Sequence, residues 1–548
     1  MKKQITKWMS IMMILVMAAS LTACGGGGAD ETGGSASAGG GTAGEQVLGF
    51  YRTTEPATLD PWVNNSSDAG VMVAAVHEPL LRKTDDGWEP ALLTDYSAND
   101  EHTVHTLTLR EGAKWSDGTD ITADDVVFSF QRALDPELGS EIAYVYYIIK
   151  NAEAYYKGEV DASELGVKEI GDYEIEITTS EPCDYFEDIL TSAQFCPVQR
   201  QAAEEYGDAY GTDVDKTVAS GPFKLTDWVH ENSMVLEKNE NYWDADNVAL
   251  ETINITITSD DNTVQGMYQN DELGVLKVKD DILEQYSGEN ITDVLSLRVS
   301  FIEFNPNSNE YMANKKIREA LSMAFDRKLF AEQVMHNKDL AAYGLVPNGV
   351  TGLSGGDFRE QAGDIVTDVS DEAEIERANT LLDEGLQEIG KTRADMENGF
   401  SIQCLESGKN QAQVIQNMWK NNLGIEMPVS VLEINVLLPM LMGGTFDCVI
   451  GGGQDSEYRD PQGFMQFIYD EGKWDDAQFR SLVEKAHSQT GDERIQTWMD
   501  VEKLVLDNFI YIPQAYTEDH WAVKPNVQGL LISDYGYEFD FKYVTITE

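Results

Sequence analysis

Residues 107–129 read LTLREGAKWSDGTDITADDVVFS. The first three of these residues end an alternating run, residues 104–109, and this run predicts a half-buried β-strand. Asp117-Gly118 is typical of a tight hairpin turn. Thr122 then predicts the N-cap of a helix, whose apolar residues recur on one face until Asp135-Pro136 ends it. A strand, a turn and an amphipathic helix in succession indicate an α/β or α+β protein.

The same two periodicities recur along the rest of the chain, without an internal repeat. Because single cores stop growing near about 250–300 residues, a chain of 548 residues is expected to form two lobes. We expect Trp88, Trp115 and Trp243 in their cores. Further strands are predicted at residues 174–178, 253–257, 429–433 and 447–450, and further helices around 317–325, 371–386, 408–423 and 493–508.

The N-terminus has the pattern of a secretory signal. Three lysines precede a short apolar run that ends in Leu21-Thr22-Ala23-Cys24. The segment resembles a bacterial lipoprotein signal, which implies that residues 1–23 are removed and that Cys24 is lipidated. An uncleaved membrane span is the alternative, but a span needs about 20 predominantly apolar residues. Residues 24–44 are rich in Gly, Ala, Ser and Thr and predict a flexible linker.

Composition excludes some partners. The net charge is −57, so the surface repels phosphate backbones, and we expect no nucleic-acid partner. The same charge argues against docking on anionic lipid without a covalent anchor. The four cysteines after Cys24 allow three disulfide connectivities, and free buried thiols are an equal alternative, so their pairing stays open. They are Cys183, Cys196, Cys404 and Cys448.

No catalytic or metal motif is complete. The run Gly352-Leu353-Ser354-Gly355-Gly356 fits the G-x-S-x-G pattern, which requires a strand before it and a helix after it. Turn residues flank it on both sides and predict a loop. His102 and His105, three apart at a strand start, would point to opposite faces. We therefore expect no enzyme activity, no metal site and no cofactor.

Several motifs follow one another in a fixed order. They are EPATLDP (55–61), EPLL (78–81), WEPAL (88–92), residues 107–129, SGPFKL (220–225), FNPN (304–307), IREALSMAFDR (317–327) and YIPQ (511–514). In this order the chain resembles the family 5 extracellular solute-binding proteins, whose closest type is the oligopeptide- and dipeptide-binding lipoproteins of peptide and nickel ABC transporters. The resemblance covers nearly the whole chain after residue 45.

The resemblance implies a two-lobed α/β fold of the periplasmic-binding-protein type (type II, venus-flytrap), with an extra subdomain on the first lobe. The first lobe would take residues 45–275 and be completed by 513–548, and the second would take 276–512. Such a protein encloses its ligand as the lobes close. The resemblance further implies a monomeric receptor, lipid-anchored outside the cell membrane, that delivers a peptide to ABC transporter permease subunits.

The resemblance also implies ligand contacts. Relatives hold the peptide α-amine with an acidic residue shortly before a proline, and spacing back from Pro461 favours Glu457, with Asp455 second. The Trp that often precedes this acid is replaced by Gly453-Gln454, which weakens the peptide assignment. Other candidate ligand-binding residues are Tyr144, Tyr146, Asn65 and Ser66.

Three other functions stay open at this stage. Within the same family, the ligand could be a sugar, a nickel chelate or another solute. The chain could be a signalling receptor for peptide pheromones. It could also be a surface hydrolase, which only Ser354 and its flanking glycines support.

Overall fold

The computed structural model describes residues 45–548 except 65, 85–86, 368–371 and 473. The described residues belong to one compact unit, Gly40–Glu548. The signal segment, the linker, Cys24 and Asn65 lie outside the described residues.

A four-stranded sheet organises the first lobe. Its strand order is β1 (Val47–Arg52), β10 (Thr252–Ile257), β9 (Ser233–Lys238) and β8 (Phe223–Val229). Buried and half-buried residues alternate along β1, the period expected of a strand with one face in a core. That core also takes Phe539 and Phe541 from the C-terminal segment, so the two ends of the chain complete one lobe.

A second four-stranded sheet forms a subdomain. Its order is β4 (Leu93–Ala98), β5 (Val104–Leu109), β7 (Glu174–Thr178) and β6 (Val167–Gly171). The predicted strand at residues 104–109 and the predicted helix after Thr122 are both confirmed. The helix is α2 (Ala123–Ala133), and Thr122 and Asp125 form a capping box at its start. Phe130 of α2 packs in one core with Leu107 and Ile175.

A six-stranded sheet organises the second lobe. Its order is β11 (Val275–Val278), β16 (Tyr511–Val523), β12 (Asn290–Phe304), β15 (Cys448–Asp455), β13 (Ile402–Cys404) and β14 (Val429–Val431). The predicted strand at 447–450 continues five residues further than expected, through Gly451-Gly452-Gly453 to Asp455. Such a run of glycines suggests backbone bends or the close approach of another group. Gly452 and Gly453 instead pair with β12, whereas Gly451 lies at the register shift with a φ of 88° and has Gly408 packed against it.

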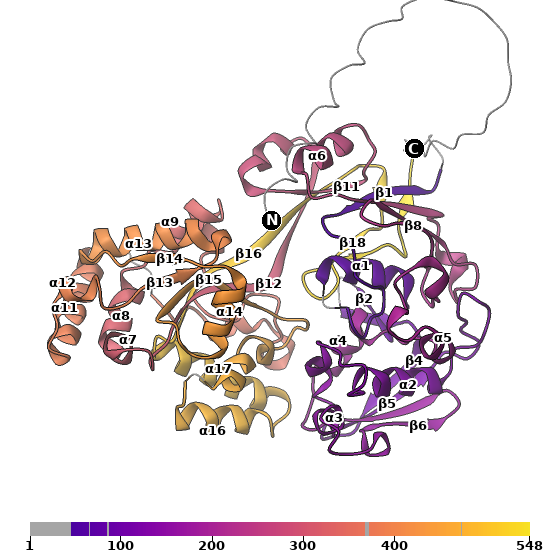
Figure 1. The fold of residues 1–548 in the computed structure, drawn as a ribbon, viewed down its shortest axis with the longest axis horizontal. Helices are drawn as coiled ribbons and strands as arrows, with labels where there is room; N and C mark the ends of the chain where they lie inside the picture. The colour runs from indigo at the N-terminus through magenta and orange to yellow at the C-terminus, as the bar shows by residue number, and fades with distance from the viewer. Residues whose placement is uncertain (1–44, 65, 85–86, 368–371, 473) are drawn as a thin grey trace, which may run out of the picture. The chain divides into compact units, whose positions relative to one another are not determined.

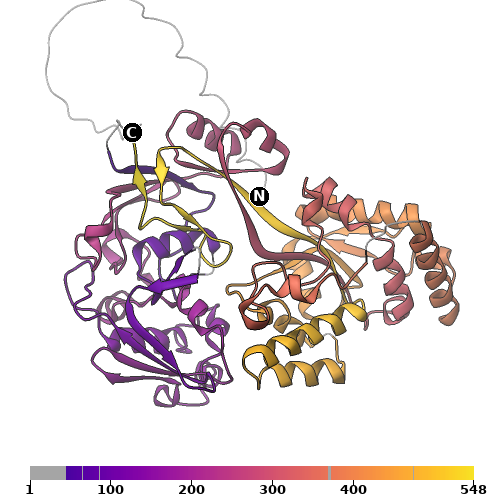
Figure 2. The same ribbon diagram turned by 180° about the vertical axis from the view of Figure 1, so that it is seen from behind.

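Two long antiparallel strands join the lobes. β12 and β16 pair from Asn290 opposite Val523 to Glu303 opposite Tyr511. Val523 lies in the core of the first lobe, whereas Phe304 and Tyr511 lie in cores of the second. Figures 1 and 2 show the two strands side by side from the β11 end into the sheet that carries β15. They are therefore shared by both lobes.

Helices and short hairpins cover these sheets, and the predicted helices at 371–386, 408–423 and 493–508 correspond to α11, α13 and α17. The remaining α-helices are α1 (Ser67–Val76), α3 (Ala152–Tyr156), α4 (Phe186–Leu190), α5 (Arg200–Tyr206), α6 (Asp261–Gln269), α7 (Glu310–Ala313), α8 (Lys315–Met323), α9 (Arg327–Val334), α10 (Phe358–Ala362), α11 (Glu372–Glu388), α12 (Arg393–Met396), α13 (Lys409–Leu423), α14 (Ile434–Met442), α15 (Gln466–Glu471), α16 (Ala477–Ala486) and α17 (Gly491–Asp507). The hairpins are β2 (Leu81–Thr84) with β3 (Gly87–Pro90), β17 (Val527–Gln528) with β20 (Thr545–Ile546), and β18 (Leu531–Ile532) with β19 (Phe539–Asp540).

The structure corrects the expected burial of one tryptophan and settles the state of the four cysteines. Trp115 is fully buried and Trp243 is half-buried, but Trp88 is 41% exposed. Trp88 lies on β3, which pairs with β2 in a two-stranded hairpin, and it lines a cavity instead of a core. The four cysteines of the described chain are buried and free, so Cys183 and Cys196 form no bridge.

Candidate functional site

The strand β15 has an unpaired edge. It pairs with β12 as far as Asp455, but with β13 only at Cys448 and Val449. Next along that edge the backbone of Gly408 packs against Gly451, where a Cβ would come within 3.0 Å of Gly408 Cα. Beyond it, within the described residues, Gly452–Asp455 have a strand partner on one side only. An unpaired edge is a template for an extended chain.

The segment that follows β15, residues 456–460, docks on the first lobe. The ring of Tyr458 stacks on Tyr185 with centroids 4.4 Å apart. The backbone N–H of Arg459 donates to Asp188 Oδ2 at 3.0 Å, and Arg459 Nη2 lies 3.0 Å from both carboxylate oxygens of Asp534. Because Asp534 belongs to the C-terminal segment, Arg459 fixes this turn of the second lobe against the first.

Glu457 lies inside this docked turn and faces Lys83 of β2. The side chain of Glu457 remains accessible to solvent, whereas Lys83 is buried. Both point at Gly536: a Cβ there would be 3.0 Å from Lys83 Nζ and 4.0 Å from Glu457 Oε2. Among the described residues, no cation forms an ion pair with the Glu457 carboxylate within 4.0 Å. In that part of the chain it is a carboxylate without an ion-pair partner at the junction of the lobes.

The charges around Lys83 and Glu457 nearly balance. Although Glu457 remains accessible to solvent, desolvation by the protein packed around it raises its pKa, and Lys83 partly opposes that rise. Burial lowers the pKa of Lys83 to about 8, against the carboxylates of Asp534, Glu457 and Asp188. Burial also raises the pKa of Asp188, which its bond from Arg459 opposes. With all five groups ionised, three carboxylates face two cations, so the cluster carries one net negative charge and suits one additional cation.

Two cavities adjoin the junction. One of about 480 Å³ is lined by Trp88, Asp184 and Glu187 of the first lobe and by Gly352 and Gly491 of the second, among others. The other, about 580 Å³, lies where β11 and β16 meet α6 and the end of α9. Both cavities are lined by residues from both lobes or from the strands that join them.

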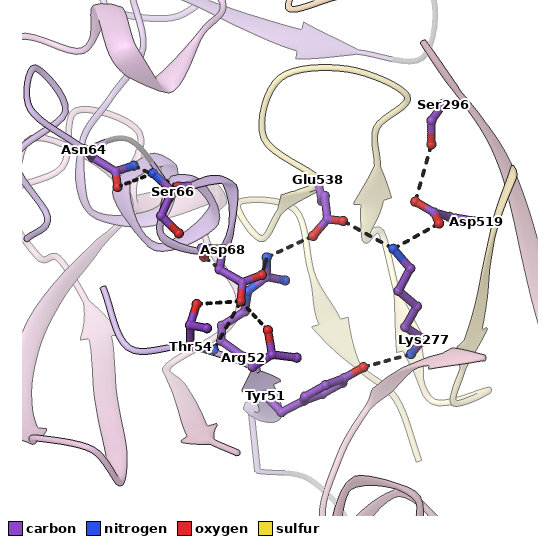
Figure 3. A network of polar contacts seen from close by, with 11 residues as sticks. Tyr51, Arg52, Thr54, Asn64, Ser66, Asp68, Lys277, Ser296, Asp519 and Glu538 are labelled. Carbon is purple, nitrogen blue, oxygen red and sulfur yellow. Dashed lines mark hydrogen bonds and ion pairs between the residues drawn. The ribbon is translucent and has the colours of Figure 1, made fainter. Parts of the chain in front are cut away.

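The loop that carries Ser66 leads into a polar network (Figure 3). Ser66 N–H donates to Asn64 Oδ1 at 3.1 Å at the start of α1. On α1, Asp68 pairs with Arg52 at 2.9 Å, and Arg52 pairs in turn with Glu538 at 2.9 Å. The series continues from Glu538 to Lys277, then to Asp519 of β16, which accepts from Ser296 of β12 at 3.4 Å. Alternating charges thus connect the Ser66 loop with the strands shared by the lobes.

The other predicted site residues do not gather around Glu457. Asp455 is exposed and pairs with Arg298 at 2.8 Å. Tyr144 is 67% exposed. Tyr146 is fully buried, with its ring 4.7 Å from Trp62 and its hydroxyl donating to Gln194 O at 3.0 Å. Tyr146 therefore belongs to the core of the first lobe. No contact is described for Asn65.

Sequence reasoning missed Lys83, Gly536 and Asp534. The only local signal was a charged pair, Arg82-Lys83, directly after the apolar Leu80-Leu81. Cations in an otherwise buried run need partners, and such partners lie far along the chain, so the spacing of residues near Glu457 could not reveal them.

Ser354 does not sit on a nucleophile elbow. A short turn holds it at a left-handed φ of 54° without a preceding strand. Its hydroxyl donates to Asp492 Oδ2 at 2.9 Å. Across the described part of the chain, no group of three or more His, Cys, Asp or Glu residues could hold a metal ion. Nor does any helix of that part have the length and apolar character to cross a membrane.

Two α/β lobes sharing a pair of long strands, with a partnerless carboxylate where they meet, define a solute-binding protein of the two-lobed type. Residues 87–476 match the model of the bacterial extracellular solute-binding proteins, family 5 Middle. Because this match spans more than half of the chain, the protein belongs to that family. The family is one of solute-binding receptors, as the order of motifs predicted.

Relatives and solved structures agree with this assignment. The chain is 28% identical over 92% of its length to the dipeptide-binding protein DppE of Bacillus subtilis, covering 92% of that protein. It is 27% identical over 89% of its length to the periplasmic oligopeptide-binding protein OppA of Salmonella typhimurium, covering 90% of it.

Among solved structures, the peptide-bound OppA of Listeria monocytogenes superposes with a TM-score of 0.74 at 24% identity, over 92% of this chain and all of that one. The pheromone receptor PrgZ superposes with a TM-score of 0.75 at 26% identity, again over 92% of this chain and all of that one. The predicted type II two-lobed fold is confirmed.

Proposed function

We propose that this protein is a lipid-anchored receptor that captures peptides between its lobes and delivers them to the permease of an ABC transporter. Family membership and the peptide-binding relatives support capture of a peptide. The anchor rests on the lipoprotein-like signal that ends at Cys24. The permease rests on the transporters that the sequence resembles.

The lobes in this proposal are residues 45–275 with 513–548, and residues 276–512. The cores support such a division, because Phe539 and Trp521 pack with the first sheet and Phe304 and Tyr511 with the second. Closure would bend β12 and β16, and the ligand would supply the free-energy difference between the open and closed arrangements.

The environment of the Glu457 carboxylate is the observation that best supports peptide binding. Its carboxylate lacks an ion pair, lies in a cluster with one net negative charge, and follows the unpaired edge of β15. A peptide offers an α-ammonium for the carboxylate and backbone groups for the edge. Hydrogen bonds from a strand edge do not depend on side-chain identity, so a broad range of peptides would bind.

Calorimetry with a matched pair of variants tests this assignment. A charge-assisted hydrogen bond contributes about 1.5–3 kcal/mol, so Glu457→Gln should weaken binding of a free-amine peptide about ten-fold or more. Asp455→Asn removes a nearby carboxylate that Arg298 already occupies, and should leave affinity within about two-fold. N-acetylation of the peptide should weaken its binding to wild type by a similar factor. It should cause little further loss of affinity in Glu457→Gln.

Two further measurements decide the rest. Native mass spectrometry of the protein purified without Cys24 should show a co-purifying peptide, and a sugar or other non-peptide solute in its place would overturn the peptide assignment. Cys24→Ser should move the protein from the membrane fraction to the medium, and deletion should abolish peptide uptake. If deletion changed gene regulation and left uptake intact, the signalling alternative would replace delivery to a permease.

A further inference from the structure

Lys83 is an unusual cation, because neutral groups hold it. Its Nζ donates to Ser533 Oγ at 2.9 Å and to the carbonyl oxygen of Tyr535, and it lies 3.6 Å from the centroid of the Tyr535 ring. An ammonium has three N–H donors, so one donor remains after these two hydrogen bonds. The nearby carboxylates act on it only through space.

A gap beside Gly536 separates Lys83 Nζ from the Glu457 carboxylate. The two distances from a Gly536 Cβ place Lys83 Nζ and Glu457 Oε2 at most 7.0 Å apart, and no ion pair within 4.0 Å joins them. Gly536 adopts a φ of 64°, a left-handed conformation that glycine tolerates without strain. A donor and an acceptor therefore face each other across a space that a direct hydrogen bond does not span.

The first residue of a peptide has the matching pair of groups. Its α-ammonium is a donor and its carbonyl oxygen an acceptor, and three covalent bonds separate the two atoms, so they lie roughly 3 Å apart. Hydrogen bonds of about 2.7–3.2 Å at each end, arranged at an angle because the gap is shorter than their sum, would then join the residue to both side chains. An amine alone would leave Lys83 facing a like charge, and a carboxylate alone would face Glu457.

We propose that Lys83 is a specificity-determining residue that donates a hydrogen bond to the first carbonyl oxygen of a captured peptide, while Glu457 accepts from the α-ammonium. The inference rests on the proposed function and names the part of the peptide that is recognised. It makes the junction a two-point site for the N-terminal residue, with the edge of β15 available to the residues that follow.

Measuring the affinities of two proteins, wild type and Lys83→Met, for two ligands isolates the contribution of this hydrogen bond. One tripeptide has its first peptide bond replaced by an ester, which keeps the carbonyl oxygen and removes the following N–H. The other has an (E)-alkene there, which removes both. Wild type should bind the ester about ten-fold more tightly than the alkene, as a hydrogen bond to a charged donor predicts. Lys83→Met should bind the two ligands equally.

The outcomes separate a binding role from a packing role. If Lys83→Met weakened both ligands by the same factor and kept the ten-fold preference for the ester, Lys83 would be structural and the inference would be overturned. If wild type bound neither these ligands nor the parent tripeptide, the proposed function itself would fail. Cooperative thermal unfolding of Lys83→Met controls for folding.

A measurement on wild type alone covers the case in which Lys83→Met does not fold. The titratable groups around Lys83 are Glu457, Asp534, Asp188, Arg459, Tyr535 and Tyr537. Since burial lowers the pKa of Lys83 to about 8, its donor weakens above that pH. The ester-to-alkene preference should fall at least three-fold between pH 7 and pH 9.5. A preference that stays constant over this range would reject Lys83 as the donor.

Discussion

Arg82 and Lys83 are consecutive cations on one short strand, and their surroundings differ in kind. Arg82 is buried between Glu78 and Asp540, which bind its two terminal nitrogens. Lys83 is equally buried, but the acceptors within bonding distance of it in the described part of the chain are neutral. Burial would lower the pKa of both, yet the carboxylates raise that of Arg82 well above its ordinary value, while the pKa of Lys83 falls to about 8.

The comparison shows how a buried charge serves structure or binding. The Arg82 cluster is complete in its ion pairs, because Glu78 and Asp540 bind the two terminal nitrogens of Arg82 and Glu78 also accepts from Tyr242 at 2.9 Å and from Trp243 at 3.1 Å. Within this cluster, only Arg82 Nε is left without a hydrogen-bond partner among the described residues. The Lys83 cluster is incomplete, because its gap leaves a donor and a carboxylate unmatched. A complete cluster fixes the fold, whereas an incomplete one has a place for a ligand.

The largest predicted effect breaks the complete cluster. Arg82→Met would leave Glu78 and Asp540 buried without their cation, which costs about 3–5 kcal/mol. Urea denaturation followed by tryptophan fluorescence should show this loss for the first lobe. Lys83→Met removes a buried charge that has no ion pair, so it should cost at least 2 kcal/mol less. Equal losses from the two variants would remove the distinction between the clusters.

Sequence alone predicted the regular parts of the fold well, for local reasons. The alternation along residues 104–109 and the cap at Thr122 are complete within a few residues, so they needed no tertiary information. The extension of β15 to Asp455 was missed because a run of glycines carries no strand pattern, and only the pairing of Gly452 and Gly453 with β12 places it in the sheet. Trp88 was misplaced because its exposure depends on what covers β3.

The candidate site was half predictable. Glu457 was predicted from the family resemblance, by its spacing to Pro461, but the role proposed for it depends on Lys83 and Gly536, which other segments bring to it. Lys83 and Ser533 are 450 positions apart in the chain. No periodicity or spacing rule relates residues at that separation. Only the docking of the C-terminal segment on β2 does so.

The next effect in size sharpens the contrast through pH. The pKa of Lys83 is about 8 in the folded protein and lies near its ordinary 10.5 when the chain unfolds. Between these values the unfolded state binds more protons, so the contribution of Lys83 to stability rises with pH. Relative to Lys83→Met, wild type should gain up to about 3 kcal/mol between pH 8 and pH 10.5. The difference between the two denaturation midpoints measures this gain, and a flat difference would contradict the depressed pKa.

The smallest effect tests the gap itself. Gly536→Ala forces a non-glycine residue into a left-handed conformation, which costs about 1–2 kcal/mol, and places a methyl group 3.0 Å from Lys83 Nζ. Gly390 has a similar φ of 68°, and a Cβ there meets nothing within 4 Å. Gly390→Ala should therefore lose similar stability but keep full affinity for a tripeptide, whereas Gly536→Ala should also weaken binding several-fold. If both variants bound the tripeptide like wild type, the space between Lys83 and Glu457 would not be where the ligand enters, even if each charge still mattered separately.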